Sequence, residues 1–179
     1  GNSFSIRTKL SLASLESGQE IICQWRNNDT KSWRLYIEDY KIHWEGYDEN
    51  HENQNFNFHA DIPIDKFDDN YITLTRNDSI WSMLLDSTLI ATNNMSGNLY
   101  NSSDKLNIGG RRIGDFSSYD LNGRIDEIII LNRVLDSTEL IDDVNNIDNE
   151  VLVYYKFNAG TDGILYDHSG NQNHGTING

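Results

Sequence analysis

The feature that most constrains the fold is residues 123–142, where a strand pattern changes into a helix-start pattern. The first half is rich in β-branched residues and ends in the apolar run Ile128-Ile129-Ile130-Leu131, which is typical of a strand covered on both faces. The second half opens with Asp136 and Glu139, the spacing of a capping box. The sequence therefore predicts a central strand followed by a short helix over residues 137–144.

Short segments of alternating apolar and polar residues recur along the rest of the chain, and this period of two predicts strands with one buried face. The expected strands cover residues 4–12, 20–26, 33–37, 41–44, 71–76, 80–85, 88–92, 106–110 and 150–158. The clearest hairpin joins 71–76 to 80–85, and residues 111–122 are expected to be a loop. Many short strands with one helix predict an all-β fold, a two-sheet antiparallel β-sandwich.

Composition excludes several classes of function. The 179 residues carry a formal net charge of −14, whereas a nucleic-acid surface needs clustered Lys and Arg, so no nucleic-acid partner is expected. No apolar run approaches the roughly 20 residues of a membrane span, so membrane insertion is not expected either. Cys23 is alone and is expected to be a small buried residue. The five histidines lack the spacing of a zinc site.

Three segments resemble, in their order along the chain, the concanavalin A-like jelly roll of lectins and glucanases, and most closely its laminin-G-like branch in bacterial and viral surface proteins. They are Leu106-Asn107-Ile108-Gly109-Gly110, Gly123-Arg124-Ile125-Asp126-Glu127, and Asn132-Arg133-Val134-Leu135-Asp136 with Glu139. Residues 71–93 also resemble a family segment, although Ser87 stands where a turn glycine is usual. The resemblance covers nearly the whole chain and implies a single jelly-roll domain over residues 1–179.

Residues 151–179 depart from the family's order, because they resemble the beginning of such a domain and yet stand at its end. They are either a permuted first strand pair or the start of a following repeat. In both cases we expect this segment to pair beside the strand at residues 123–131, in cis or from a neighbouring copy.

A structural calcium ion is the first candidate site. The loop at residues 167–173 offers carboxylate, amide and backbone oxygens, the ligands that Ca²⁺ prefers. The resemblance implies an ion between the closing strand and this loop, held by Asp126, Asp167, Gly170 and Asn171. The alternative is that Asp126 binds local amides and that Asp167 forms an Asx turn.

Aromatic residues form the second candidate site, because sugars stack on flat rings while amides and carboxylates bind their hydroxyls. The candidate ligand-binding residues are Trp33, Tyr40, Tyr47, Tyr100 and Tyr119. Trp25, Trp44 and Trp81 lie in strand patterns and are expected in the core.

The resemblance implies a non-catalytic carbohydrate-binding or adhesion module of a larger extracellular, cell-surface or virion protein, with a glycan or cell-surface polysaccharide as partner. One alternative is a glycoside hydrolase of the same fold, but the Glu-x-Asp-x-x-Glu triplet of the jelly-roll glucanases is absent from the sequence. The other alternative is a structural or protein-interaction domain without a sugar site.

Overall fold

The computed structural model describes residues 3–25, 30–50, 56–63, 68–113, 116–136, 138–140, 150–158 and 163–178, with the backbone alone for residues 112–118. The chain divides into two compact units, each built from segments that are far apart in the sequence. Unit 1 comprises Gly1–Ser11, Asp68–Thr92 and Ile125–Gly179, and unit 2 comprises Leu12–Phe67 and Asn93–Arg124. All regular structure in the described residues is β-strand.

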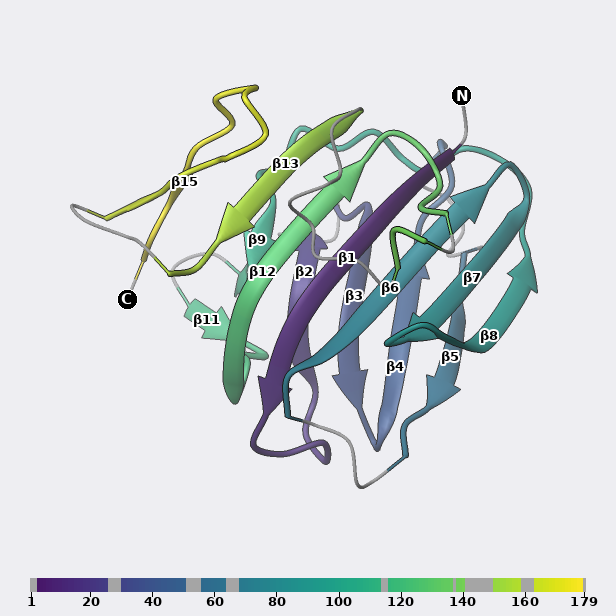
Figure 1. The fold of residues 1–179 in the computed structure, drawn as a ribbon, viewed down its shortest axis with the longest axis horizontal. Helices are drawn as coiled ribbons and strands as arrows, with labels where there is room; N and C mark the ends of the chain where they lie inside the picture. The colour runs from purple at the N-terminus through teal and green to yellow at the C-terminus, as the bar shows by residue number, and fades with distance from the viewer. Residues whose placement is uncertain are drawn as a thin grey trace. The chain divides into compact units, whose positions relative to one another are not determined.

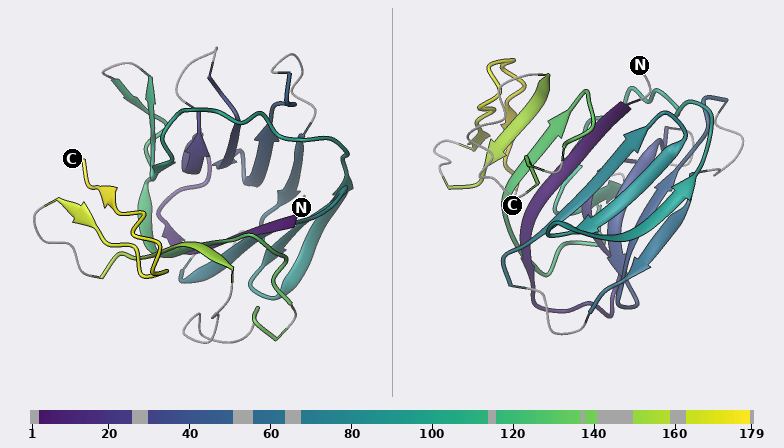
Figure 2. Two further views of the ribbon diagram at one scale, coloured as in Figure 1. Left: turned by 90° about the horizontal axis from the view of Figure 1, so that it is seen from above. Right: turned by 45° about the vertical axis from the view of Figure 1, so that its right-hand side comes forward.

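Unit 1 contains a six-stranded sheet in the order β13-β12-β1-β6-β7-β8 (Figure 1). Its strands are β1 (Ser3–Leu12), β6 (Asn70–Asn77), β7 (Ile80–Leu85), β8 (Thr88–Asn94), β12 (Gly123–Leu131) and β13 (Val151–Lys156). A small hairpin of β14 (Ile164–Leu165) and β15 (Gly175–Thr176) follows, and both views of Figure 2 show this C-terminal segment beside β13.

The apolar face of this sheet follows from its register. Ile6 on β1 lies opposite Leu74 on β6, and Leu74 lies opposite Met83 on β7, so alternate residues of three strands project to one side. These three side chains are at most 2% exposed. The alternation in the sequence therefore predicted the buried face correctly.

Unit 2 contains a five-stranded sheet in the order β5-β4-β3-β2-β9. Its strands are β2 (Gln19–Gln24), β3 (Trp33–Glu38), β4 (Lys41–Gly46), β5 (Phe58–Asp61) and β9 (Asn107–Ile108). Leu35 pairs with Trp44 and Ile37 pairs with Ile42, and these four side chains form the apolar face. The residues between them on the same strands are polar or charged, and they make up the opposite face.

Residues 111–122 are not a plain loop, as the sequence predicted, because they contain the hairpin of β10 (Arg111–Ile113) and β11 (Phe116–Ser118). The hairpin is only three residue pairs long. Such a short pairing leaves almost no periodic signal in the sequence, which explains why it was missed.

The predicted capping box forms, but the described residues contain no helix. Asp136 Oδ1 accepts hydrogen bonds from the N–H groups of Thr138 and Glu139, and Glu139 Oε2 accepts one from the Asp136 N–H. Residues 138–140 form a turn, while residues 137 and 141–149 lie outside the described residues. The carbonyls of Glu139 and Leu140 accept hydrogen bonds from the guanidinium of Arg7.

The tail pairs where the sequence predicted. β13 pairs antiparallel with β12 in the same chain, with Ile129 opposite Tyr154. Ile128 and Ile129 are both at most 1% exposed, although they project to opposite faces of the sheet. β12 is therefore a central strand covered on both faces, as its sequence indicated.

Candidate functional site

The polar face of unit 2 gathers charged and aromatic side chains from neighbouring strands. Tyr36 on β3 lies opposite Glu20 on β2 and His43 on β4, so all three share a face. Arg34 lies opposite Glu45, and His43 lies opposite His59. We call this set the polar face, and it consists of Glu20, Arg34, Tyr36, His43, Glu45 and His59.

Arg34 is the centre of the polar face. Its Nη1 lies 3.2 Å from Glu20 Oε1, and its Nε donates a hydrogen bond of 2.7 Å to Glu45 Oε2. The second oxygen of Glu45 accepts a 2.7 Å hydrogen bond from the Tyr36 hydroxyl. The Arg34 guanidinium also lies 3.9 Å from the centre of the Tyr36 ring, a cation–π arrangement. The Trp25 ring lies 4.9 Å from the same guanidinium, so one cation is held by two carboxylates and two rings.

A second arginine reaches the same carboxylate from the β10 strand. Arg111 Nη1 lies 3.7 Å from Glu20 Oε1, and its guanidinium lies 4.5 Å from the centre of the Tyr119 ring. The Trp25 ring lies within 6 Å of three cations, the side chains of Lys31, Arg34 and Arg111. Positive charge therefore gathers around Trp25 in a chain whose net charge is strongly negative.

Glu20 is unusual among carboxylates because it is buried. Its side chain is 0% exposed, and its Oε2 atom has no hydrogen-bond partner among the described residues. Burial raises the pKa of Glu20, although Arg34 and Arg111 act in the opposite direction. For Arg34, burial alone would lower the pKa, but the hydrogen bond to Glu45 and the charge of Glu20 raise it.

Two histidines extend the face toward β5. The rings of Tyr36 and His43 are stacked with centroids 4.7 Å apart, and the rings of His43 and His59 are 5.4 Å apart. Burial lowers the pKa of His43, and the neighbouring His59 adds to this effect. Within the described residues no group of three or more His, Cys, Asp and Glu side chains could hold a metal ion.

The predicted sugar-binding residues divide into two sets. Tyr47 and Tyr119 lie beside the polar face. The Tyr47 and Trp25 ring centroids are 5.5 Å apart, and the Tyr119 ring contacts the guanidinium of Arg111. Tyr119 is 43% exposed. Trp33 instead stacks on Trp44 of the apolar face, with ring centroids 5.3 Å apart.

Tyr40 and Tyr100 have other structural positions. Tyr40 sits in the β3–β4 turn at a φ of 61°, and its hydroxyl donates a hydrogen bond to Glu16. Tyr100 is half-buried, and its N–H donates a hydrogen bond to the Tyr47 carbonyl. Sequence reasoning missed the charged residues of the polar face. In the run Arg34-Leu35-Tyr36-Ile37, polar side chains alternate with aliphatic ones, and this alternation could have identified the polar face.

The two acidic residues of the predicted calcium site lie along opposite edges of β13. The carbonyl of Asp126 on β12 accepts a hydrogen bond from Phe157 at one edge of β13, whereas Asp167 accepts one from Tyr154 at the other edge. The Asp167 carboxylate accepts four hydrogen bonds in all, from the N–H groups of Tyr154, Ser169 and Asn173 and from the Ser169 hydroxyl. The bond from the Ser169 N–H to Asp167 Oδ1 is the Asx turn of the alternative.

Gly170 has a φ of 90°, and the Asn171 side chain donates hydrogen bonds to the carbonyls of Val151 and Leu152.

Calcium binding itself stays a prediction. We expect added calcium chloride to raise the midpoint of thermal unfolding if an ion binds only the folded chain. An unchanged midpoint after prior treatment with a chelator would contradict calcium binding.

The sequence comparison decides the family. Residues 1–141 match the concanavalin A-like lectin/glucanases superfamily. The chain belongs to this superfamily. The predicted fold class, a two-sheet antiparallel β-sandwich of the jelly-roll type, is therefore confirmed, apart from its short helix. The tail after residue 141, with β13 to β15, lies outside the matched region. No curated protein matches this concanavalin A-like chain in sequence.

Solved structures share the fold of this concanavalin A-like chain. A Bacteroides ovatus protein to which carbohydrate binding is ascribed has a TM-score of 0.77 at 16% identity, covering 99% of this chain and 52% of its own. The CBM40 of a Ruminococcus gnavus IT-sialidase bound to α2,3-sialyllactose has a TM-score of 0.65 at 17% identity. The matched region covers 78% of this chain and 81% of the CBM40 chain. The receptor-binding domain of botulinum neurotoxin type G has a TM-score of 0.56 at 19% identity. The matched region covers 78% of this chain and 37% of the neurotoxin chain. This chain thus spans about half of the first of these proteins.

Proposed function

We propose that the chain is a non-catalytic carbohydrate-binding module of a larger extracellular or surface protein, and that the polar face of unit 2 binds the glycan. The observation that carries this proposal is the array of two guanidiniums, two carboxylates and several aromatic rings on one side of one sheet. Such a surface offers both donors and acceptors to sugar hydroxyls, and its rings offer flat apolar contacts. The described residues contain no helix long and apolar enough to cross a lipid bilayer.

The ligand class that suits this surface best is an acidic glycan. Arg34, Arg111 and Lys31 outnumber the two carboxylates of Glu20 and Glu45 here, and guanidinium groups bind carboxylates with paired hydrogen bonds. Lys31 adds a third positive charge beside the Trp25 and Tyr47 rings. The sialyllactose in the R. gnavus CBM40 structure is a glycan of this class, which supports the proposal without deciding it.

The proposed module is non-catalytic because of the position of Arg34. Hydrolysis of a glycosidic bond needs two carboxyl groups that face the bond from either side. On the polar face, the two carboxylates of Glu20 and Glu45 both bind Arg34, which stands on the strand between them. Because the Arg34 guanidinium binds both carboxylates, neither is free to act as a general acid or a nucleophile. Release of reducing sugar in a screen of polysaccharides would contradict this part of the proposal.

The test is a comparison of 3′-sialyllactose with lactose by titration calorimetry. We expect 3′-sialyllactose to bind more tightly, and we expect Tyr47→Ala to weaken its binding about tenfold, or ~1.4 kcal/mol, because a ring contact is lost. Tyr166→Ala is the matched control, since Tyr166 is an exposed tyrosine of unit 1. Equal affinity of Tyr47→Ala and the parent chain would place the glycan elsewhere.

The structural or protein-interaction alternative makes a different prediction. A glycan array without a hit, together with a solution mass above that of the monomer, would favour it over the carbohydrate-binding module. The same array would show whether neutral cell-surface polysaccharides compete with acidic ones.

A further inference from the structure

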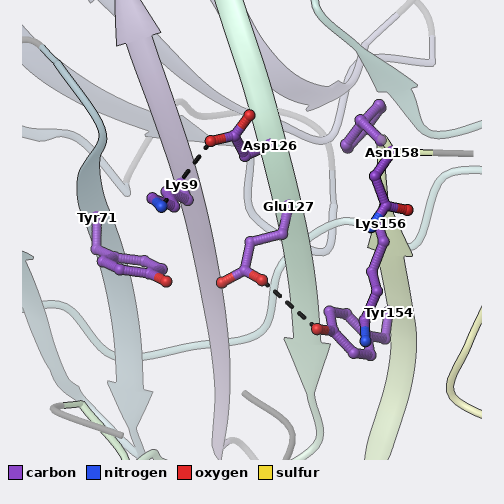
Figure 3. A pocket seen from close by; sticks show the side chains of 8 residues that line it. Lys9, Tyr71, Asp126, Glu127, Tyr154, Lys156 and Asn158 are labelled. Carbon is purple, nitrogen blue, oxygen red and sulfur yellow. Dashed lines mark hydrogen bonds and ion pairs between the residues drawn. The ribbon is translucent and has the colours of Figure 1, made fainter. Parts of the chain in front are cut away.

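A second hollow lies in unit 1, on the six-stranded sheet, and has a volume of about 380 Å³. Figure 3 shows its side chains, which come from four adjacent strands. Its charged and tyrosine side chains are Lys9, Tyr71, Asp126, Glu127, Tyr154 and Lys156.

Strand register brings these residues together. Lys9 on β1 lies opposite Tyr71 on β6, and Glu127 on β12 lies opposite Lys156 on β13. The Thr8 hydroxyl donates a hydrogen bond to the Glu127 carbonyl, which ties β1 to β12. The hollow is therefore built on a paired sheet rather than on loops, and its geometry is fixed by backbone hydrogen bonds.

The lining balances positive and negative groups. Lys9 Nζ lies 3.9 Å from Asp126 Oδ2, and these side chains are 29% and 35% exposed. Lys156 Nζ lies 4.9 Å from the centre of the Tyr154 ring, and Lys9 Nζ lies 5.8 Å from that of Tyr71. The Arg7 guanidinium lies 4.0 Å from the centre of the Tyr71 ring, but it is not part of the lining and donates to the carbonyls of Glu139 and Leu140. The two ammonium groups and two carboxylates of the lining leave it without net charge, so it favours neither a metal ion nor an anion.

Glu127 stands in the middle of this group, with its carboxylate between the Tyr71 and Tyr154 rings in Figure 3. Its Oε2 lies 3.5 Å from the Tyr154 hydroxyl. Its Oε1 is buried and has no hydrogen-bond partner among the described residues. Buried carboxylate oxygens are rarely left without a donor, so this atom indicates where a ligand group would bind.

We propose that this hollow is a second binding site and that it takes a neutral, hydroxyl-rich sugar ring. Carboxylates only accept hydrogen bonds and ammonium groups only donate them, whereas a hydroxyl does both. A sugar can therefore donate to Glu127 Oε1 and accept from Lys9 or Lys156 at the same time. The Tyr71 and Tyr154 rings supply apolar contacts for its C–H faces. All of these residues belong to unit 1, so the proposed site is independent of the polar face of unit 2.

The test is a titration followed by amide chemical shifts, with galactose, mannose, fucose and N-acetylglucosamine as separate neutral probes. We expect at least one of them to produce saturable shifts at the amides of Lys9, Glu127 and Lys156, with a dissociation constant on the order of 1 mM. Calcium chloride and sodium sulfate serve as the charged probes, and saturable binding of either at these amides would overturn the proposal.

Two variants connect the shifts to the side chains. Glu127→Gln and Lys156→Met should each weaken the sugar's binding at least fivefold, while Glu49→Gln and Lys41→Met, exposed or half-exposed residues of unit 2, should leave it unchanged. The amide spectrum of each variant reports whether it folds. The proposal fails if no neutral sugar shifts these amides, or if both unit 1 variants bind like the parent. Loss of sialyllactose binding in Tyr47→Ala with the unit 1 shifts retained would show that the two sites are separate.

Discussion

Replacement of Arg34 by methionine is expected to lower the free energy of unfolding by about 3 kcal/mol. Glu20 is 0% exposed, and Arg34 is its nearest positive partner at 3.2 Å, with Arg111 at 3.7 Å. Without Arg34, the buried Glu20 carboxylate keeps Arg111 at 3.7 Å as its one positive partner among the described residues, and Glu45 loses its 2.7 Å contact. Removal of one member of a buried ion pair is among the most costly single changes in a protein, because it leaves an uncompensated charge.

The stability lost in Arg34→Met should depend on pH through the ionisation of Glu20. Burial raises the pKa of Glu20 above its ordinary value of 4.5, so Glu20 contributes stability below that value and loses it as the pH rises through the raised pKa. Removal of Arg34 removes a positive charge that lowers the pKa, so Glu20 should take up a proton at a still higher pH. The deficit of Arg34→Met should therefore be largest near neutral pH and should shrink toward pH 4.

Urea unfolding of four chains measures the coupling between the two residues: the parent, Arg34→Met, Glu20→Gln and the double variant. We expect Glu20→Gln to restore a large part of the stability lost in Arg34→Met, because it removes the uncompensated charge. Additive effects in the double variant, or a deficit that stays constant between pH 4 and pH 7, would show that the ion pair does not stabilise the polar face.

Replacement of Asp167 by alanine is expected to lower the free energy of unfolding by about 2 kcal/mol. The Asp167 side chain accepts four hydrogen bonds, and the residue is 8% exposed. One of the four comes from the Tyr154 N–H on the outer edge of β13. Loss of the Asp167 carboxylate should leave the Tyr154 N–H without this acceptor. Protection of the Tyr154 amide from hydrogen exchange should therefore fall together with the free energy of unfolding.

Asp167 has the opposite pH dependence to Glu20. Burial alone would raise the pKa of Asp167, but the hydrogen bonds from Tyr154, Ser169 and Asn173 outweigh it and hold the pKa below the ordinary 3.8. Its contribution is therefore present above pH 3.8 and is lost as the pH falls through the lower, folded-state pKa. The difference between the parent and Asp167→Asn should vanish in strong acid.

Asp61→Ala is the matched control for this prediction. The Asp61 side chain is 87% exposed and pairs only at the surface with Lys41, at 3.6 Å, so its removal should barely change the stability. An Asp167→Ala variant as stable as Asp61→Ala would mean that the 167–173 loop does not support the edge of β13.

The sequence by itself determined the fold class, the central strand at residues 123–131 and the hairpin at residues 71–85. These features depend on residues close together in the chain, because the period of two assigns alternate side chains to opposite faces and a short turn sets the register. The capping box at Asp136 and Glu139 was predictable for the same reason. The contact of Arg7 with the carbonyls of Glu139 and Leu140 was not predictable, because Arg7 lies more than a hundred residues earlier in the chain.

The tertiary structure alone decided the composition of both candidate sites. Glu20, Arg34 and Arg111 come from three strands, and Lys9, Glu127 and Lys156 come from three others, so neither group is contiguous in the sequence. It also decided that β13 stands between Asp126 and Asp167, which a spacing in the sequence cannot show. The order of strands in a sheet is set by the summed packing and hydrogen bonding of the whole chain, and this information is absent from any local pattern.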